Sequence, residues 1–271
     1  MRFQEIVELM TRLDLGEPGQ PRRPRRENLA VLQDTLRRGL EDPDFRLDCI
    51  ELDLAAWRTW ERDGWSGSKP PIATVPELGF FLMMFFWPPG EVSPPHEHTS
   101  WTMSAVFHNR LEVATYDWER AVSARRLETR NLFTAEAGRV EFILEPAIHS
   151  PRNTTAVGAT SFHIYNADDG PVLEAQVGAI EGLASYGTSG EEPLPPRPLA
   201  LFLDARQQVL RAHAGAAERF PCARSAAVLE ALHRGGDAGT RAAVARSMRV
   251  VDPVGADARV ERWRQASPTE A

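Results

Sequence analysis

The chain has 271 residues and a formal net charge of -7 at pH 7, with 42% hydrophobic and 25% charged residues. This composition is ordinary for a soluble globular protein, and the acidic balance provides no overall basic field for nucleic acid or an anionic membrane. The basic run PRRPRR at 21–26 is followed closely by acidic residues, so we interpret it as a solvated connection.

The sequence gives no sign of export or of a membrane span. Its first residues, MRFQEIVELM, contain acids where a signal peptide would be apolar. The longest apolar run, at 80–89, is about half of what a membrane helix needs. The two cysteines, Cys49 and Cys222, lie far apart and form no disulfide framework, which fits a reducing compartment. We therefore expect a cytoplasmic protein, and the richness in Ala, Arg and Pro favours a bacterial source.

Residues 1–75 have helical periodicity and form the first expected region. Apolar residues recur every three or four positions at 5–13 and 28–40, and 51–61 is expected to be a third helix. The turn-rich stretch DGWSGSKPP closes this region at 63–71.

Residues 76–190 change to short β-like segments separated by Gly, Pro, Asn and Asp, which is typical of a sandwich or a barrel. The run FFLMMFFW does not alternate, so both faces of that strand should be covered. We expect strands near 78–87, 102–107, 110–116, 139–144, 160–165 and 171–178.

Residues 191–271 return to the helical period after the stiff connector PLPPRP at 193–198. The amphipathic segments here must bury their apolar stripes somewhere. The alternatives are the mouth of a barrel, a homodimer interface, or a partner enzyme in a pathway.

Two of the seven histidines, His96 and His98, lie one residue apart directly after the apolar run. Residues i and i+2 of a strand project from the same face, so both imidazoles could bind one ion. The next histidine in the β-rich region is His149, in EPAIHSPRN. The pair alone is equally compatible with a surface loop that binds no metal.

The surrounding residues resemble the cupin superfamily. WPPGEVSPPHEHTSW is similar to its first motif, in which a glycine (here Gly90) precedes the H-x-H pair, and AGRVEFILEPAIHSPRN is similar to its second motif, with Asn153 four positions after His149. Within the superfamily, SFHIYNA at 161–167 resembles the Ser-x-His-x-Tyr triad of the cysteine dioxygenase family of thiol dioxygenases.

This resemblance implies a mostly β chain: a cupin double-stranded β-helix, or jelly-roll barrel, with N-terminal helices packing on it (1–75), the barrel and its metal site (76–190) and a C-terminal helical extension (191–271). It also implies Fe(II) bound by His96, His98 and His149. The catalytic residues would be Tyr165, His163 and Ser161, with a small-molecule thiol and dioxygen as substrates and a sulfinic acid as product.

The chain departs from the family pattern in several places. No acid follows the H-x-H pair, which suits a three-histidine site, and Met103 replaces the cysteine that eukaryotic members can cross-link to the triad tyrosine. The arginine that holds the substrate carboxylate is absent from GSKPPIATVPEL. The candidate replacements are Lys69, Arg58, Arg110 and Arg152.

The missing arginine leaves two rival functions open. One is a cupin metalloenzyme that cleaves or rearranges a non-thiol molecule, and the other is a non-catalytic metal-binding cupin. Imidazole ligands alone would also suit Zn, Cu, Ni or Mn. We expect ordinary structural places for the remaining residues of interest: the surface or a turn for His108, His213 and His233, packing for Trp87 and Trp101, and a half-buried site for Cys222.

Overall fold

The computed structural model describes residues 1–16, 23–64, 69–98, 100–118, 127–144, 147–166 and 199–266. It begins with three helices, α1 (Phe3–Arg12), α2 (Arg26–Glu41) and α3 (Pro43–Arg62). The third helix starts eight residues earlier than its periodicity predicts. Asp42 caps it, because its carboxylate accepts from the backbone N–H groups of Asp44 and Phe45, and Pro43 occupies the first turn, where no N–H is needed.

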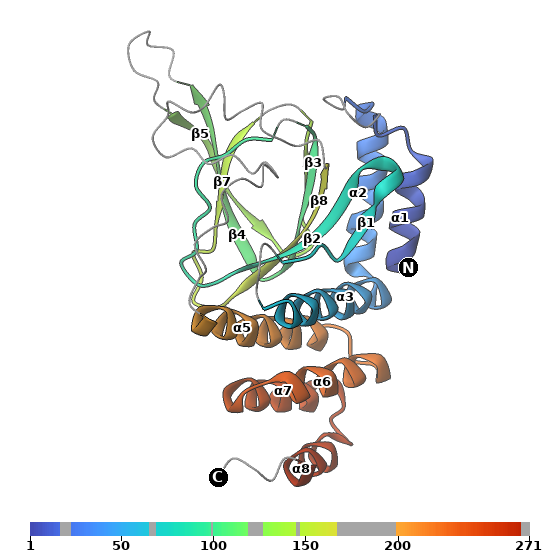
Figure 1. The fold of residues 1–271 in the computed structure, drawn as a ribbon, viewed down its shortest axis with the longest axis vertical. Helices are drawn as coiled ribbons and strands as arrows, with labels where there is room; N and C mark the ends of the chain where they lie inside the picture. The colour runs from blue at the N-terminus through green and yellow to red at the C-terminus, as the bar shows by residue number, and fades with distance from the viewer. Residues whose placement is uncertain are drawn as a thin grey trace.

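The middle of the chain forms two antiparallel sheets that face each other (Figure 1). The larger sheet has the order β1-β2-β8-β3-β6, and the smaller has the order β5-β4-β7. The strands are β1 (Ala73–Val75), β2 (Phe80–Trp87), β3 (Thr102–His108), β4 (Arg110–Trp118), β5 (Leu127–Glu136), β6 (Val140–Ile143), β7 (Ile148–Arg152) and β8 (Ala159–Asn166), with a 3-10 turn at Pro76–Leu78.

The larger sheet is covered on both faces, as the non-alternating sequence of β2 predicts. On the outer face Phe162 of β8 packs against Phe45 of α3 and Phe3 of α1, with ring centroids 6.2 and 6.4 Å apart. On the inner face Phe85 of β2 packs against His163. The helices therefore bury the apolar outer face, and the inner face is available to line a cavity between the sheets.

The antiparallel sheets and flanking helices fit the expected architecture, but the expectation of a mostly β chain is wrong. Helices contribute at least as many described residues as strands do. The described strands form two sheets, and their edge strands β5 and β6 do not pair with each other.

The sequence-based list of strands is incomplete. Strands β1, β5 and β7 were not expected. Strand β5 reads LETRNLFTAE and lies at an exposed edge of the smaller sheet, and β7 contains Pro151, which an edge strand tolerates. The strand expected at 171–178 and the boundary at 190/191 lie outside the described residues.

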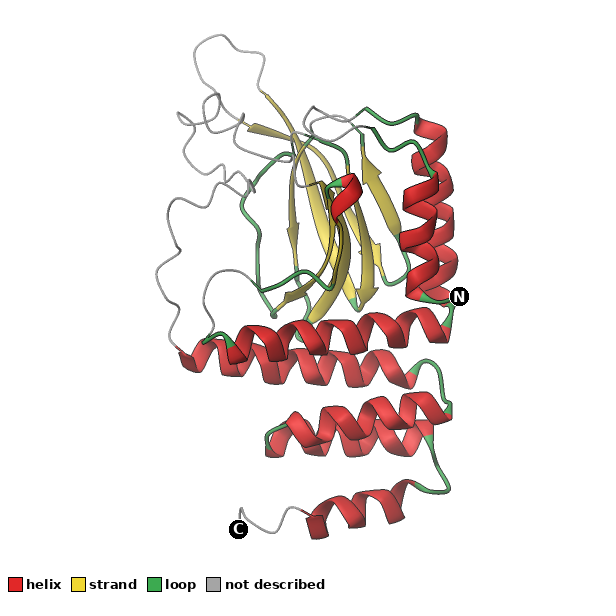
Figure 2. Cartoon of the chain, turned by 45° about the vertical axis from the view of Figure 1, so that its right-hand side comes forward, coloured by secondary structure: helices red, strands yellow, loops and turns green. Residues whose placement is uncertain are grey.

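The C-terminal helices extend away from the sheets (Figure 2). They are α5 (Leu199–Glu218), α6 (Ala223–Gly235), α7 (Ala238–Val251) and α8 (Ala256–Ala266). Helix α5 lies beside α3 across one end of the sheets, and Gly215 of α5 faces the ring of His108 at the end of β3. No helix in the described part of the chain combines the length and the apolar character that a membrane crossing requires.

A buried polar cluster fastens α5 to α3. Asp53 of α3, 3% exposed, accepts hydrogen bonds from Lys69 and from the Nε2 of His213, which lies on α5 and is fully buried. The expectation that His213 is a surface residue is therefore wrong. Burial by itself would raise the pKa of Asp53, but the charges and hydrogen bonds of Lys69 and His213 outweigh it and lower that pKa below the ordinary value.

Replacing Asp53 by alanine should lower the free energy of unfolding by about 3–5 kcal/mol, because it leaves the Lys69 ammonium buried without its carboxylate. Urea denaturation would measure the change, and Asp34→Ala, which removes an exposed partner of Arg37, should change it by less than about 0.5 kcal/mol. Because the folded pKa of Asp53 is lowered, its stabilising contribution is complete at neutral pH and is lost as the pH falls below the ordinary carboxyl range. Equal losses in the two variants would contradict this account.

Candidate metal centre

Three histidines that are distant in sequence meet between the two sheets. His96 and His98 lie on the connection from β2 to β3, and His149 lies on β7. One ring nitrogen from each lies within 4.8 Å of the others, and the ring centroids of His96 and His149 are 4.3 Å apart. His96 and His98 are 4% and 2% exposed, so the cluster faces the interior.

The H-x-H pair does not lie on a strand, contrary to expectation. Pro94 and Pro95 precede it, and because proline has no backbone N–H the chain cannot continue a regular ladder there. Of the two histidines in the pair, His96 is the one that forms a backbone bridge. Its N–H donates to the carbonyl of His149 at 2.9 Å, and its carbonyl accepts from the N–H of His149 at 2.8 Å. This backbone pair places the two side chains together.

Backbone carbonyls orient two of the three rings. The Nδ1 atoms of His96 and His149 each lie 2.9 Å from a carbonyl, that of Pro94 and that of Ala147. A carbonyl only accepts, so each Nδ1 carries the proton and each Nε2 keeps its lone pair for a metal. Burial, followed by the charge of His149, lowers the pKa of His96 to about 3, which keeps that ring in the neutral, ligating form.

The donor set fits a metal ion. Two imidazole nitrogens about 2.1 Å from one ion lie at most about 4.2 Å apart. The three ligand nitrogens of the cluster lie within 4.8 Å of one another. Side-chain rotations that move each nitrogen by about an ångström would therefore bring all three onto one ion. In the described part of the chain this cluster contains histidines only, and neutral ligands of this kind leave a divalent ion its full charge.

Ser161, His163 and Tyr165 lie on the inner face of β8 and form a hydrogen-bonded chain. The Nε2 of His163 is 2.7 Å from the Ser161 hydroxyl, and its Nδ1 is 3.2 Å from the Tyr165 hydroxyl and 2.9 Å from that of Ser104. The ring of Tyr165 is 5.4 Å from that of His98, centroid to centroid. The chain thus runs toward the histidine cluster.

Trp87 extends this chain. Its indole N–H can only donate, and it lies 2.7 Å from the Ser161 oxygen. The Ser161 hydroxyl can donate its own proton to the Nε2 of His163, and in that tautomer the Nδ1 of the neutral ring carries the proton and donates to the oxygen of Tyr165 or Ser104. Burial, followed by the charge of His98, lowers the pKa of His163 to about 3 and keeps the ring neutral.

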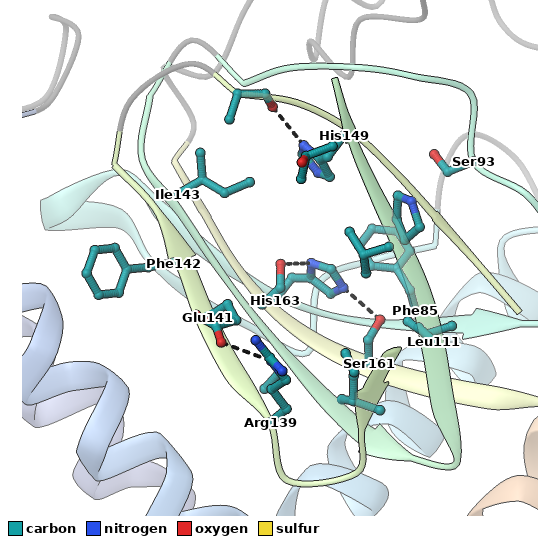
Figure 3. Close-up of a pocket in the computed structure, with 18 of the residues that line it drawn as sticks. Phe85, Ser93, Leu111, Arg139, Glu141, Phe142, Ile143, His149, Ser161 and His163 are labelled. Atoms are coloured by element: carbon teal, nitrogen blue, oxygen red, sulfur yellow. Dashed lines mark hydrogen bonds and ion pairs between the residues drawn. The ribbon is translucent and has the colours of Figure 1, made fainter. Parts of the chain in front are cut away.

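Two histidines of the cluster and the hydrogen-bonded chain line one cavity of about 380 Å³ between the sheets (Figure 3). Its lining includes His96, His149, Ser161, His163 and Tyr165. The smaller sheet contributes mainly apolar side chains. In Figure 3, Arg139 and Glu141 lie at the end opposite His149, and His163 lies between.

None of the candidate carboxylate-holding cations lines the cavity. Lys69 pairs with Asp53, Arg110 with Glu136 and Arg152 with Glu112, whereas Arg58 is exposed on α3. The arginine that does line the cavity is Arg139, which sequence reasoning missed. The signal that the sequence offered for Arg139 was its place next to Gly138, in the turn directly before β6.

Other motif residues support the backbone around the site. Gly90 adopts a left-handed conformation with φ of 78°, which favours glycine, and its N–H donates to the carbonyl of Asn153. The side chain of Asn153 is buried and donates to the carbonyl of Trp87 at 2.8 Å. Met103 is buried on the face of β3 opposite to that of Ser104. It pairs with Ile164 of β8, the residue before Tyr165, so its side chain points away from that of Tyr165.

The remaining expected structural residues have mixed outcomes. Trp101 is fully buried, as expected, and donates to the carbonyl of Leu15. His108 packs against α5, and burial lowers its pKa to about 4. His233 stacks on Trp263. Cys222 is exposed and caps α6, so its expected half-buried site is wrong.

Replacing His96, His98 or His149 singly by alanine should reduce the metal that copurifies or rebinds to less than about a tenth of the wild-type content, because each removal leaves two ligands. His233→Ala, which removes an imidazole at the C-terminal helices, should retain the wild-type content. Elemental analysis after loading would measure both, and thermal unfolding should show stabilisation by metal only where the three rings are intact. Full loading of the three cluster variants would contradict the assignment.

No family model matches this chain, and no curated protein matches it. Among solved structures it is similar to a cupin-2 domain-containing protein from Shewanella frigidimarina, with 16% identity over 38% of this chain and 80% of that one and a TM-score of 0.27. An oxalate oxidase is 18% identical over 48% of this chain and 57% of that one, with a TM-score of 0.27. A protein from Thermus thermophilus is 14% identical over 38% of this chain and 84% of that one, with a TM-score of 0.29. Likeness at this level assigns no activity to this chain.

Proposed function

We propose that this protein is a mononuclear non-haem iron dioxygenase that oxidises a thiol to a sulfinic acid. In this reaction a thiolate and one molecule of dioxygen combine to form the sulfinate. Both oxygen atoms go to sulfur, which loses four electrons, and dioxygen gains them, so no external reductant is needed. The observation that carries the proposal is that three histidines form one cluster, and two of them, His96 and His149, line the same cavity as a tyrosine-ended hydrogen-bonded chain.

The ligand set supports the redox part of the proposal. His96, His98 and His149 would hold the ion without adding negative charge, which favours an anionic partner such as a thiolate. Fe(II), when bound, would supply the one-electron chemistry that allows dioxygen to react with the thiolate.

The chain of hydroxyls and rings supports the proton-handling part. His163 holds the Tyr165 oxygen by donating from its Nδ1, and the Tyr165 hydroxyl can then donate its own proton toward the reacting atoms in the cavity. Phe85 packs at 5.0 Å from the His163 ring and 6.0 Å from the Tyr165 ring, centroid to centroid, so the relay is fixed in place and shielded from water.

Oxygen uptake by the iron-loaded protein in the presence of thiols tests this function directly. We expect consumption of one dioxygen per thiol and a product that has gained two oxygen atoms, measured by an oxygen electrode and mass spectrometry, with cysteine, 3-mercaptopropionate and cysteamine as the first panel. His149→Ala taken through the same iron-loading step is the control and should consume none. Oxygen uptake only with non-thiol molecules would favour the rival metalloenzyme, and full iron loading without any turnover would favour a metal-binding protein.

A double-mutant cycle tests the hydrogen-bonded chain. Tyr165→Phe should slow turnover roughly a hundredfold without loss of iron, because it removes the proton donor. Trp87→Phe should slow it about tenfold, since Ser161 and His163 lose the group that sets their orientation. If Trp87 acts through Tyr165, the double variant should be no slower than Tyr165→Phe, whereas independent losses that multiply would contradict the chain. Tyr116→Phe, on β4 but outside the cavity lining, is the matched control.

A further inference from the structure

The cavity has two ends that the strand registers place far apart. Tyr165 and the histidine cluster mark one end. At the other end Arg139 lies level with Ser161, because Val106 donates to the Arg139 carbonyl at 3.0 Å and pairs with Ser161 across the ladder. Tyr165 lies four positions after Ser161 along β8, which at about 3.3 Å per residue is about 13 Å.

The wall between these ends is apolar. Val113 of β4 pairs with Phe133 of β5, and Leu111 pairs with Ala135, and all four side chains line the cavity. Val106 and Trp87 pack with them. Cavities of about 300 Å³ or more accommodate ligands well beyond the size of a free amino acid, and the volume here is about 380 Å³.

Arg139 is the cation at the far end, where it pairs with Glu141. Its Nε donates to Glu141 at 2.9 Å, and its guanidinium carbon lies 4.8 Å from the centroid of the Phe133 ring. These contacts orient the guanidinium, and the bond to Glu141 uses its Nε alone. The N–H groups of both Nη atoms therefore point away from Glu141. The side chain is 45% exposed, which places it at the mouth of the cavity rather than in its floor.

The part of the cavity near the histidines contrasts with this end. The described polar residues that line it there are hydroxyl-bearing side chains and the histidine and tyrosine of the site, with no arginine or lysine among them. A short amino acid bound at the histidines would therefore find no described cation within reach of its carboxylate. A longer molecule could reach Arg139.

We propose that the substrate has an extended apolar body with an anionic group, such as a carboxylate, at the end opposite the reacting group, and that Arg139 binds this anion. The proposal rests on the proposed function for the identity of the reacting group, a thiol. The apolar walls of β4 and β5 would contact the body of the molecule, and its length would match the distance between the histidine cluster and Arg139. Arg139 is then the residue that determines substrate length and charge.

Binding of thiol-free probes tests the substrate class independently of turnover. Calorimetry would compare octanoate, octanamide and propionate on the metal-free protein, in which a carboxylate cannot bind to an ion, and on the iron-loaded protein. We expect octanoate to bind the wild type about tenfold more tightly than octanamide, and propionate to show no measurable binding. Arg139→Gln should lose the preference for octanoate, Arg139→Lys should keep part of it, and Arg130→Gln, an exposed arginine paired with Asp117 outside the cavity, should keep it fully.

Each outcome of this experiment bears on a different part of the proposal. Equal binding of octanoate and octanamide by the metal-free wild type would overturn the role of Arg139, and absence of binding by both would overturn the apolar body. Faster oxygen uptake with ω-mercapto-octanoate than with 3-mercaptopropionate would support the complete substrate. Arg139-dependent binding of octanoate together with no oxygen uptake for any thiol would support the ligand class while rejecting the dioxygenase function.

Discussion

The exchange of two backbone hydrogen bonds between His96 and His149 is the constraint on which the site depends. The connection that carries His96 leaves the larger sheet at Trp87, and β7, which carries His149, belongs to the smaller sheet. The bridge therefore links the two sheets at one end of the cavity. It continues the backbone bonds between residues 90–93 and 151–153, and together these direct the imidazoles of PPHEHTSW toward a residue 53 positions away from His96.

The helices at the start of the chain make the polar inner face of the larger sheet possible. Phe162 lies between Ser161 and His163 in sequence and points to the opposite side, where Phe45 and Phe3 bury it. Alternation along β8 thus places the relay on one face and a fully buried aromatic anchor on the other. Since the outer face supplies the apolar burial, the inner face can present hydroxyls and a neutral imidazole that are satisfied by one another.

The sequence predicted the composition of the site better than its surroundings. The residues found from spacing and resemblance were His96, His98, His149, Ser161, His163 and Tyr165. The structure brings the three histidines into one cluster and places all of these residues except His98 in the lining of one cavity. Trp87, Ser104 and Arg139 were missed as site residues because their contacts depend on the pairing of strands from distant parts of the chain. Strand β5 was not predicted because an exposed edge strand has no apolar alternation. The burial of His213 was not predicted because it depends on docking of α5 against α3.

The strands that line the cavity differ in chemistry. Strands β3 and β8 of the larger sheet contribute Ser104, Ser161, His163 and Tyr165, whose hydrogen bonds form one connected set. Strands β4 and β5 of the smaller sheet contribute mainly apolar side chains that make none of these bonds, whereas its third strand, β7, carries His149. A substitution on β4 or β5 can therefore change the shape offered to the body of a substrate while the hydrogen bonds of Trp87, Ser161 and His163 stay in place. Removal of the Ser161 hydroxyl has the opposite consequence, because it takes away the hydrogen-bond partner of the buried Nε2 of His163 and disturbs the bonds that follow it.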